Sequence, residues 1–358
     1  MRFRALFLML LLLSACGTSP PAPKTPLVVA GYFTEWGVYD RGYRVKDLAA
    51  DRLTHLKYAF GKIVDGKCAV GDAWAAYQKP TAAEDSVDGV ADPGGGTFGQ
   101  LRKLKARHPE LKLLWSFGGW NDSAGFTEAA RDPARFAASC RALLADPRWA
   151  GLFDGIDVDW EYPNACGREC DTSGPGALTA MLAALRTALG ADAVITAAVP
   201  ADIAKLRAAD YAGAARHADW LGAMTYDYFG TTGFTEAPHS PLSAYPGIPR
   251  DTATTDATVT ELLNIGVPAS KLLIGVGFYG RGTTGMEDYR LLAGRCPPTG
   301  TLGGTAYARC GGQWWSYDTP ETIGAKVEYA RGRGLAGMFA WELSGDTPDA
   351  RLLTALNG

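Results

Sequence analysis

The sequence has few residues of the kinds that most often hold metals, dinucleotides or nucleic acids. Only four histidines occur, His55, His108, His217 and His239, and none clusters with another or with a cysteine pair. The glycine runs at 94–96 and 118–119 lack the order of strand, GxGxxG and helix that binds a dinucleotide. The net charge of −3 offers no positive excess to attract nucleic acid. We therefore expect no metal, no cofactor and no nucleic-acid partner.

Long apolar runs are also missing, apart from a short one at the N-terminus. Residues 5–13 are apolar, follow Arg2 and Arg4, and end at Ser14-Ala15-Cys16. A basic start, a short apolar core and small residues are typical of a secretory signal, and the core is too short to span a bilayer permanently. Residues 17–26 are rich in Pro, Ser and Thr, which indicates an extended tether.

The end of this signal, Leu13-Ser14-Ala15-Cys16, resembles a bacterial lipoprotein cleavage box. That resemblance implies a signal peptide at 1–15, a lipidated Cys16, a tether at 16–26 and a mature domain at 27–358. Gly17 after the cysteine resembles lipoproteins sent to the outer membrane, so we expect export and a lipid anchor at the outer membrane or cell surface. A plain secretory signal is the alternative.

Six cysteines remain once Cys16 is set aside, and an even number in an exported protein indicates up to three disulfides with fifteen connectivities. We favour two pairs because each closes a loop between periodic segments, Cys166 with Cys170 and Cys296 with Cys310. Cys68 with Cys140 is left by elimination. Metal binding is the rival interpretation of Cys-x3-Cys, but no histidine lies nearby.

Strand-like apolar runs alternate with amphipathic helical segments over the whole mature chain. The strand runs are residues 27–33, 53–60, 111–117, 155–161, 193–199, 220–226, 272–278 and 337–341. The helical segments between them include 98–106, 133–144, 177–189, 254–265 and 321–332. Eight such units predict an α/β protein, a closed (β/α)8 TIM barrel. The alternative, an open doubly wound sheet, is less favoured because the glycine-rich phosphate-binding turn of that fold is missing from the sequence.

The stretch from Phe153 to Pro163 carries the strongest functional pattern. In a strand, Asp157, Asp159 and Glu161 face one side, with same-face neighbours about 6.6–7 Å apart at Cα. Carboxylates this close inside a fold cannot all ionise, so the row is expected to titrate as a coupled unit with at least one acid protonated near neutrality. A protonated acid at the C-terminal rim of a barrel is suited to general acid catalysis.

Several strand ends resemble one family. Asp154, Asp157, Asp159 and Glu161 spell DxxDxDxE before Tyr-Pro, which resembles the fourth-strand motif of family 18 glycoside hydrolases, the chitinases. Residues 116–120 (SFGGW) and 224–228 (MTYDY) resemble the SxGG and MxYD motifs of that family, and 338–342 (MFAWE) its last strand. Residues 31–33, 58–60 and 279–281 match the ends of strands one, two and seven.

The resemblance implies hydrolysis of β-1,4 bonds between N-acetylglucosamine residues of chitin, with retention and with the substrate's acetamido group as nucleophile. It assigns catalysis to Glu161 as acid and base, to Asp159, which would hold the acetamido N–H and share its proton with Asp157, and to Tyr226. Substrate binding is expected from Tyr32, Phe60, Gly119, Trp120, Met224, Asp227, Tyr228, Arg281 and Trp341. Asp154 has the opposite parity and is expected to be structural. The resemblance also implies cis peptide bonds at 59–60, 161–162 and 341–342.

One segment departs from many bacterial members of the family. Their α+β insertion after strand seven has only residues 282–317 available here, so we expect a short loop tied by Cys296 and Cys310. Trp314 or Trp315 would then be an outer sugar platform, or would pack under the loop.

Two other functions remain open, an endo-β-N-acetylglucosaminidase acting on N-glycans and a non-catalytic chitin-binding lectin. Lectins of this kind typically lack the last acid, which Glu161 supplies. We expect a monomer whose partner is chitin or chitooligosaccharides, with no binding module after the barrel.

Overall fold

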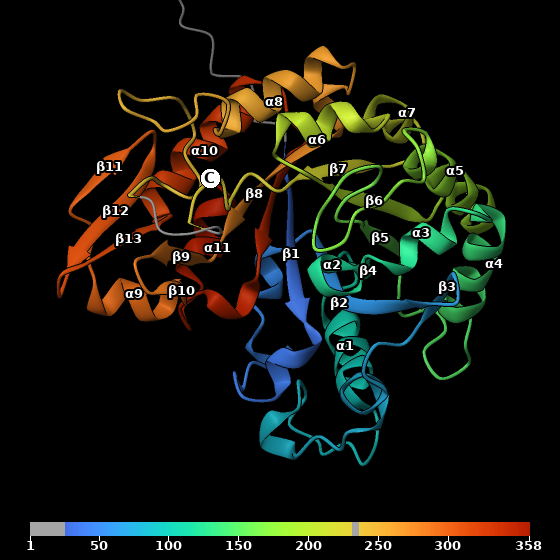
Figure 1. The fold of residues 1–358 in the computed structure, drawn as a ribbon. Helices are drawn as coiled ribbons and strands as arrows, with labels where there is room; N and C mark the ends of the chain where they lie inside the picture. The colour runs from blue at the N-terminus through green and yellow to red at the C-terminus, as the bar shows by residue number, and fades with distance from the viewer. Residues whose placement is uncertain (1–25, 231–235) are drawn as a thin grey trace, which may run out of the picture.

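Eight parallel strands close into a barrel in the computed structural model, which describes residues 26–230 and 236–358 (Figure 1). Around the barrel the strands follow the order β1-β14-β8-β7-β6-β5-β4-β2, and β2 pairs with β1 to complete the circle. Their bounds are β1 Val28–Thr34, β2 His55–Val64, β4 Lys112–Gly118, β5 Gly155–Asp159, β6 Val194–Val199, β7 Trp220–Ala223, β8 Leu272–Gly277 and β14 Gly337–Trp341. The predicted TIM barrel is confirmed.

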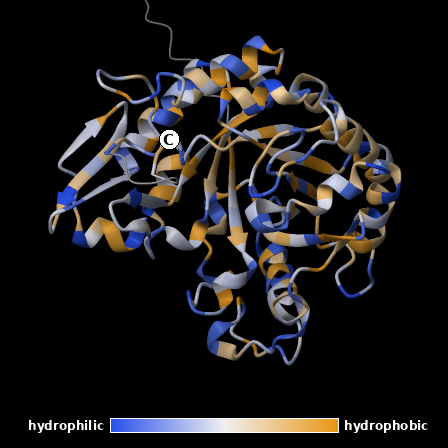
Figure 2. Cartoon of the chain, viewed as in Figure 1, coloured by the Kyte–Doolittle hydropathy of each residue, from blue (hydrophilic) through white to orange (hydrophobic). Residues whose placement is uncertain are grey.

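The strands are apolar because both of their faces are covered, as in other all-parallel sheets. Figure 2 shows the barrel strands mostly in the hydrophobic colour. Polar residues interrupt this pattern at one level of the interior, where Ser116 of β4, Asp157 of β5 and Thr196 of β6 are in register. The acid row therefore begins inside the barrel and continues toward the C-terminal ends of the strands.

The outer layer consists of helices that follow the strands. The longer ones are α1 Gly96–Arg107, α4 Pro133–Leu144, α5 Ala177–Leu189, α8 Thr255–Asn264 and α10 Pro320–Gly332. The shorter ones are α2 Gly119–Asp122, α3 Gly125–Ala129, α6 Ile203–Ala208, α7 Tyr211–Ala215 and α11 Arg351–Leu356. Polar side chains fix several starts: Asp132 accepts a hydrogen bond from the Arg135 amide at 3.0 Å, and Thr254 from the Ala257 amide at 3.1 Å.

The segment after β8 corrects one expectation, because residues 282–317 do not form a simple loop. Five antiparallel strands, in the order β10-β9-β13-β12-β11, make a separate small sheet beside the barrel (Figure 1). They are β9 Tyr279–Gly282, β10 Gly285–Asp288, β11 Gly300–Leu302, β12 Thr305–Cys310 and β13 Gln313–Tyr317, with helix α9 Tyr289–Arg295 between β10 and β11. The chain thus carries a compact α+β insertion. Short strands joined by tight glycine turns allow the backbone N–H and C=O groups of this segment to hydrogen-bond to one another.

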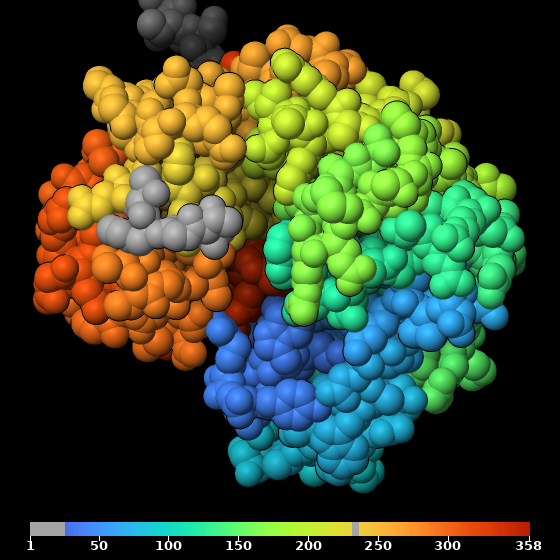
Figure 3. Space-filling view, viewed as in Figure 1, coloured from blue at the N-terminus to red at the C-terminus, as the bar shows by residue number. Residues whose placement is uncertain are grey.

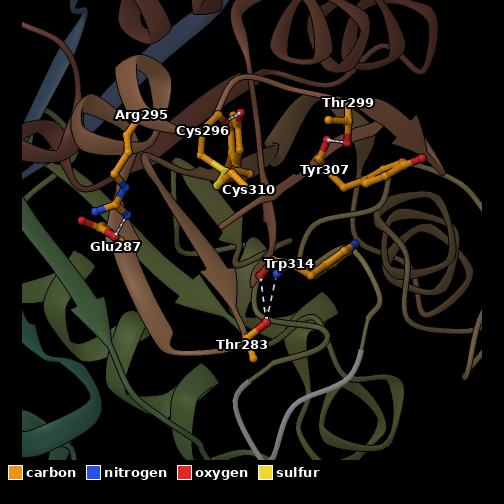
Figure 4. The surroundings of a disulfide bond; sticks show 9 residues. Thr283, Glu287, Arg295, Cys296, Thr299, Tyr307, Cys310 and Trp314 are labelled. Carbon is orange, nitrogen blue, oxygen red and sulfur yellow. Dashed lines mark hydrogen bonds and ion pairs between the residues drawn. A yellow bond between two sulfur atoms is a disulfide. The ribbon is translucent and has the colours of Figure 1, made fainter. Parts of the chain in front are cut away.

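All three expected disulfides are present, Cys68–Cys140, Cys166–Cys170 and Cys296–Cys310. The first joins β3 (Lys67–Ala69), the partner of β2 in a hairpin, to α4. The last joins the end of α9 to the end of β12 in the insertion (Figure 4). The interpretation of these cysteines as disulfides over metal ligands is confirmed.

The expected signal peptide, Cys16 and nearly all of the tether lie outside the described residues. Within 26–230 and 236–358, the helices are all too short or too polar to cross a membrane. The three expected cis peptide bonds, 59–60, 161–162 and 341–342, are all present.

Candidate active site

The acid row rises from the interior of the barrel along β5. Asp157 is fully buried and accepts hydrogen bonds from four side chains on four strands. Its Oδ1 receives Lys57 Nζ at 2.8 Å and the Thr196 hydroxyl. Its Oδ2 receives the Tyr32 hydroxyl at 2.8 Å and the Ser116 hydroxyl at 2.7 Å. The base of the row is therefore a fixed, fully satisfied carboxylate.

The three acids differ in their tendency to hold a proton. Burial alone would raise the pKa of Asp157, but the charge and hydrogen bond of Lys57, with the hydrogen bonds from Thr196 and Ser116, lower it. Burial, together with the charges of Glu161 and Asp157, raises the pKa of Asp159 well above its ordinary value. The surroundings of the row therefore favour the ionised form of Asp157 at its base and the protonated form of Asp159 above it.

Glu161 stands at the rim with a pKa suited to proton transfer. Burial raises the pKa of its carboxyl to about 7, partly offset by Tyr162 and by the charge of Lys205. Its backbone amide donates to the hydroxyl of Ser123 at 2.9 Å. That hydroxyl lies within hydrogen-bond distance of two carbonyl oxygens, of Gly119 at 2.8 Å and of Asp159 at 3.1 Å. Ser123 thus fixes the backbone between the second and third acids.

A hollow of about 360 Å³ adjoins Glu161. Its lining includes Trp120, Tyr162 and Arg168. Trp120 is half exposed, and Arg168 donates to the side chain of Asn121. Figure 3 shows a hollow in this face of the molecule between the orange insertion, the blue segment after β1 and the green loops.

Aromatic rings form the floor beside the acids. Trp341, at the end of β14, lies with its ring 5.2 Å from Tyr32 and 5.7 Å from Phe60, the latter nearly parallel. Trp36, which is 46% exposed, extends this group outward, 6.1 Å from Phe60 and 6.5 Å from Trp341. Since the Tyr32 hydroxyl binds Asp157, the aromatic floor and the acid row are in direct contact.

Tyr226 and Asp227 enter the site from the segment that follows β7. Burial raises the pKa of the Tyr226 hydroxyl well above its ordinary value, helped by Tyr279, Asp159 and Glu161, so it remains a hydrogen-bond donor. Asp227 accepts hydrogen bonds from Arg281 at 2.6 and 2.8 Å and from Tyr279 at 2.9 Å. Burial alone would raise its pKa, but His239 and Arg281 hold it well below the ordinary value.

Two glycines leave space for these side chains. Gly119 has a φ of 77°, and a Cβ there would lie 2.5 Å from the ring of Phe60. A Cβ on Gly275 would lie 2.7 Å from the ring of Tyr226. Gly119 was expected to bind substrate, and in the structure the absence of a Cβ there makes room for the ring of Phe60. Met224 is half buried and packs against the same interior cluster as Tyr226 and Trp341.

Some expected residues lie elsewhere. Tyr228 is buried, with its hydroxyl 2.7 Å from that of Thr258 on α8, so it does not join the acid row. Trp314 and Trp315 are both buried in the insertion, which makes them packing residues and not exposed platforms (Figure 4). Asp154 accepts from the Leu113 amide at 2.8 Å and from Lys105 at 2.6 Å, at the start of β5, where it supports the strand.

Four residues of the site were not expected from the sequence, Trp36, Lys57, Ser123 and Lys205. Trp36 follows the aromatic end of β1, and this position is the one local feature of the sequence that could have placed Trp36 at the site. Lys57 shares the parity of Ala59 on β2 and so points inward with it. Nothing local marks Ser123 or Lys205, because their roles depend on contacts between distant segments.

The fold, together with the family match that follows, defines a glycoside hydrolase built on a TIM barrel, with three acids along β5 and aromatic rings beside them. The sequence profile described as Glycosyl hydrolases family 18 matches residues 28–346, and the chain belongs to that family. None of the described residues forms a group of three or more His, Cys, Asp or Glu side chains arranged to hold a metal.

Curated relatives and solved structures agree with this family. The chain is 52% identical to Chitinase C of Streptomyces lividans over 89% of its length and 57% of that protein, and 50% identical to Chitinase 63 of Streptomyces plicatus over 92% and 60%. It therefore spans about three fifths of these relatives. The catalytic domain of a psychrophilic chitinase B from Arthrobacter TAD20 superposes with a TM-score of 0.87, at 30% identity, over 93% of this chain and 94% of that one.

Proposed function

We infer that the protein hydrolyses β-1,4 bonds between N-acetylglucosamine residues in chitin and chitooligosaccharides, with retention of configuration. The observation that carries this proposal is the acid row itself beside an aromatic floor: Asp157 is hydrogen-bonded on both oxygens, Asp159 is buried, and burial raises the pKa of Glu161 to about 7. The similarity to chitinases of two Streptomyces species supports it.

In the proposed reaction Glu161 protonates the glycosidic oxygen, and the acetamido carbonyl of the substrate attacks its own anomeric carbon to form an oxazolinium. The leaving sugar departs with the proton of Glu161. The carboxylate of Glu161 then takes a proton from a water molecule as that water attacks the anomeric carbon and opens the oxazolinium. Asp159 Oδ1 has no partner within the described chain, so it is free to accept the acetamido N–H. Tyr226 would donate to the acetamido oxygen.

Sugar binding follows from the aromatic groups and from the paired Asp227 and Arg281. Trp341 would stack under the sugar at the cleavage point, and Trp36 and Trp120 would contact sugars on either side of it. Their exposed fractions, 46% and 51%, leave ring surface for a ligand.

The decisive experiment is product analysis on chitin oligomers of several lengths, with wild type and Glu161→Gln. We expect wild type to release the β-anomer first, and the variant to lose about 10²–10⁴-fold in kcat while binding oligomers nearly as well. Release of the inverted α-anomer would overturn the mechanism. The same assay on a high-mannose glycoprotein tests the endo-β-N-acetylglucosaminidase alternative, which release of the glycan would favour. If wild type binds chitin oligomers without hydrolysing them, the lectin alternative is favoured.

The location of the protein is part of the proposal. We propose that residues 1–15 are removed on export and that Cys16 is lipidated, which holds the barrel at the outer membrane or cell surface through the tether at 16–26. The supporting observation is the sequence Leu13-Ser14-Ala15-Cys16 after a short apolar core.

A further inference from the structure

Lys57 is a lysine inside the barrel, in contact with the acid row but not part of it. Its side chain is 1% exposed, and its Nζ lies 2.8 Å from Asp157 Oδ1 and 3.3 Å from the Tyr32 hydroxyl. The same Nζ lies 4.8 Å from the ring centroid of Tyr32 and 5.5 Å from that of Phe339. A full positive charge therefore sits under the carboxylates, where water cannot screen it.

The hydrogen bonds of Asp157 favour its ionised form. A carboxylate has about four acceptor positions, and Lys57, Thr196, Tyr32 and Ser116 fill them, two on each oxygen. Protonation of Asp157 would require one of the three hydroxyls to turn from donor to acceptor, and it would leave the charge of Lys57, which can only donate, buried without an anionic partner. Both effects oppose protonation of Asp157.

Asp159, the next acid on the same face of β5, has the opposite surroundings. It is 4% exposed, and its Oδ1 has no hydrogen-bond partner. It also stands between two other carboxyl groups on the same strand face, those of Asp157 and Glu161. A buried carboxyl without donors, placed among like charges, keeps its proton.

We propose that Lys57 is a positioning residue for the reaction: it holds Asp157 as a permanent anion, so that Asp159 alone carries the proton of this pair. The pair then does not share one proton between two equivalent carboxylates. This proposal rests on the proposed function of the acid row, because it states how that row is prepared before the substrate binds.

The alternative is that Lys57 only stabilises the fold. Buried ion pairs are weak evidence for stability, because desolvation of both groups offsets most of their attraction. The chain contains a matched case, Lys326 of α10, 2.6 Å from Asp318 Oδ2, with side chains 1% and 0% exposed. Lys326 also donates to the carbonyl oxygen of Ser240 at 2.7 Å, next to the insertion and away from the acid row.

Several titratable groups face the Lys57–Asp157 pair from the surrounding strands and must be included in any interpretation of its pH dependence. They are Tyr32 on β1, His55 on β2, Asp159 and Glu161 on and after β5, and Tyr226 after β7.

The test compares Lys57→Met with Lys326→Met in the whole protein. Loss of Lys57 removes the charge that keeps Asp157 ionised, so we expect the acidic limb of the kcat/KM profile to move to higher pH by about one unit or more. We expect Lys326→Met to lower stability without moving either limb. An unchanged acidic limb in a folded Lys57→Met variant would overturn the proposal, whereas absence of hydrolysis by wild type would overturn the proposed function instead.

A second measurement does not depend on activity or on a variant of Lys57. Wild-type protein labelled with ¹³C at the aspartate carboxyl carbons is titrated by NMR between about pH 3 and 8, a window that includes the ordinary carboxyl pKa values of about 4. The two signals are assigned by their loss in Asp157→Asn and Asp159→Asn. We expect Asp157 to remain ionised throughout while Asp159 is protonated. Two signals that move together, as for one shared proton, would overturn the proposal even if Lys57→Met failed to fold.

Discussion

The hydroxyl of Ser123 accepts a hydrogen bond from the backbone amide of Glu161 at 2.9 Å, and it lies 3.1 Å from the carbonyl oxygen of Asp159. One buried side chain from the loop after β4 thus holds the backbone on both sides of Trp160. Because the carboxyl of Glu161 must reach a glycosidic oxygen, its placement depends on a residue that never touches the substrate.

We therefore expect Ser123→Ala to lower kcat about tenfold with little change in KM, since a small displacement of a catalytic group is costly. The unpaired buried amide should also lower the free energy of unfolding by about 1–3 kcal/mol. Steady-state kinetics and denaturant unfolding measure the two effects. Ser139→Ala is the matched control, because Ser139 also bonds a backbone amide, that of Cys68 at 3.0 Å, but far from the acids. Equal kinetics for the two variants would contradict this role.

Lys205 tunes the proton donor from outside the row. Its Nζ lies 3.9 Å from the ring centroid of Tyr162, and its charge lowers the pKa of Glu161, which burial raises to about 7. Since Glu161 acts in its protonated form, activity should fall as pH rises through about 7. Lys205→Met should raise the pKa of Glu161 and move the alkaline limb upward by roughly half a unit.

The pH profile of kcat/KM measures this shift. Lys103→Met serves as the control, because Lys103 pairs with Asp88 at 2.7 Å on the outer surface of α1. A limb that stayed in place, or moved to lower pH, would show that Lys205 does not act on Glu161.

Glu35 is a buried carboxyl that the proposed mechanism does not use. It accepts from the Tyr58 hydroxyl at 2.6 Å and from the Asp72 amide at 2.8 Å, yet burial raises its pKa to about 7. The folded protein therefore binds this proton more tightly than the unfolded chain, so stability should fall as pH rises from about 4.5 to about 7. The difference between a pKa of 4.5 in the unfolded chain and about 7 in the fold corresponds to at most about 3–4 kcal/mol.

Glu35→Gln should remove that part of the pH dependence. Denaturant unfolding at about pH 5 and pH 8 should show a smaller loss of stability at the higher pH for this variant than for wild type. Glu110→Gln, on the exposed surface, should leave the difference between the two pH values as in wild type. If Glu35→Gln behaves like Glu110→Gln, Glu35 does not titrate in this range.

The barrel and the acid row could be predicted from the sequence because both follow from local backbone geometry. Alternation along a strand places Asp157, Asp159 and Glu161 on one face whatever surrounds them. Tyr226 and Trp341 were assigned to the same site through the resemblance of their strand ends to family motifs, in agreement with the rule that the ends of parallel barrel strands meet at one rim. These inferences needed no knowledge of tertiary contacts.

Lys57 and the insertion show where local reasoning fails. Lys57 is buried only because Asp157, two strands away around the barrel, supplies its counter-charge. In the insertion, both Gly303-Gly304 and Gly311-Gly312 have positive φ throughout and turn the chain between β11, β12 and β13. Such glycine pairs indicate two-residue hairpin turns, and that signal was available in the sequence.

Cys16 provides a test of location that is independent of catalysis. We expect wild type expressed in a two-membrane bacterium to incorporate labelled fatty acid and to partition into detergent, because stable anchoring requires covalent lipid. Cys16→Ala should abolish the label and release active barrel in soluble form. Label retained in Cys16→Ala would contradict lipidation at this residue, and an unlabelled wild type would favour the plain secretory signal.

The disulfide Cys296–Cys310 ties together two elements of the insertion (Figure 4), and the small sheet of the insertion leads on to the site. It joins α9 to β12, which pairs with β13, and β13 pairs with β9, where Ser316 is opposite Arg281. Arg281 in turn binds both oxygens of Asp227. Closing a loop with a separation of 14 residues stabilises by about 3 kcal/mol in the chain-entropy account.

Replacing both cysteines by alanine should therefore loosen the insertion and weaken its hold on Arg281. We expect faster limited proteolysis within residues 283–313 and a several-fold lower kcat/KM for chitin oligomers. The matched control removes Cys68 and Cys140, which tie β3 to α4 on the outside of the barrel. That control should lose stability while keeping its kinetics. If the two double variants lose kcat/KM to the same extent, the insertion affects the site only through the general stability of the protein.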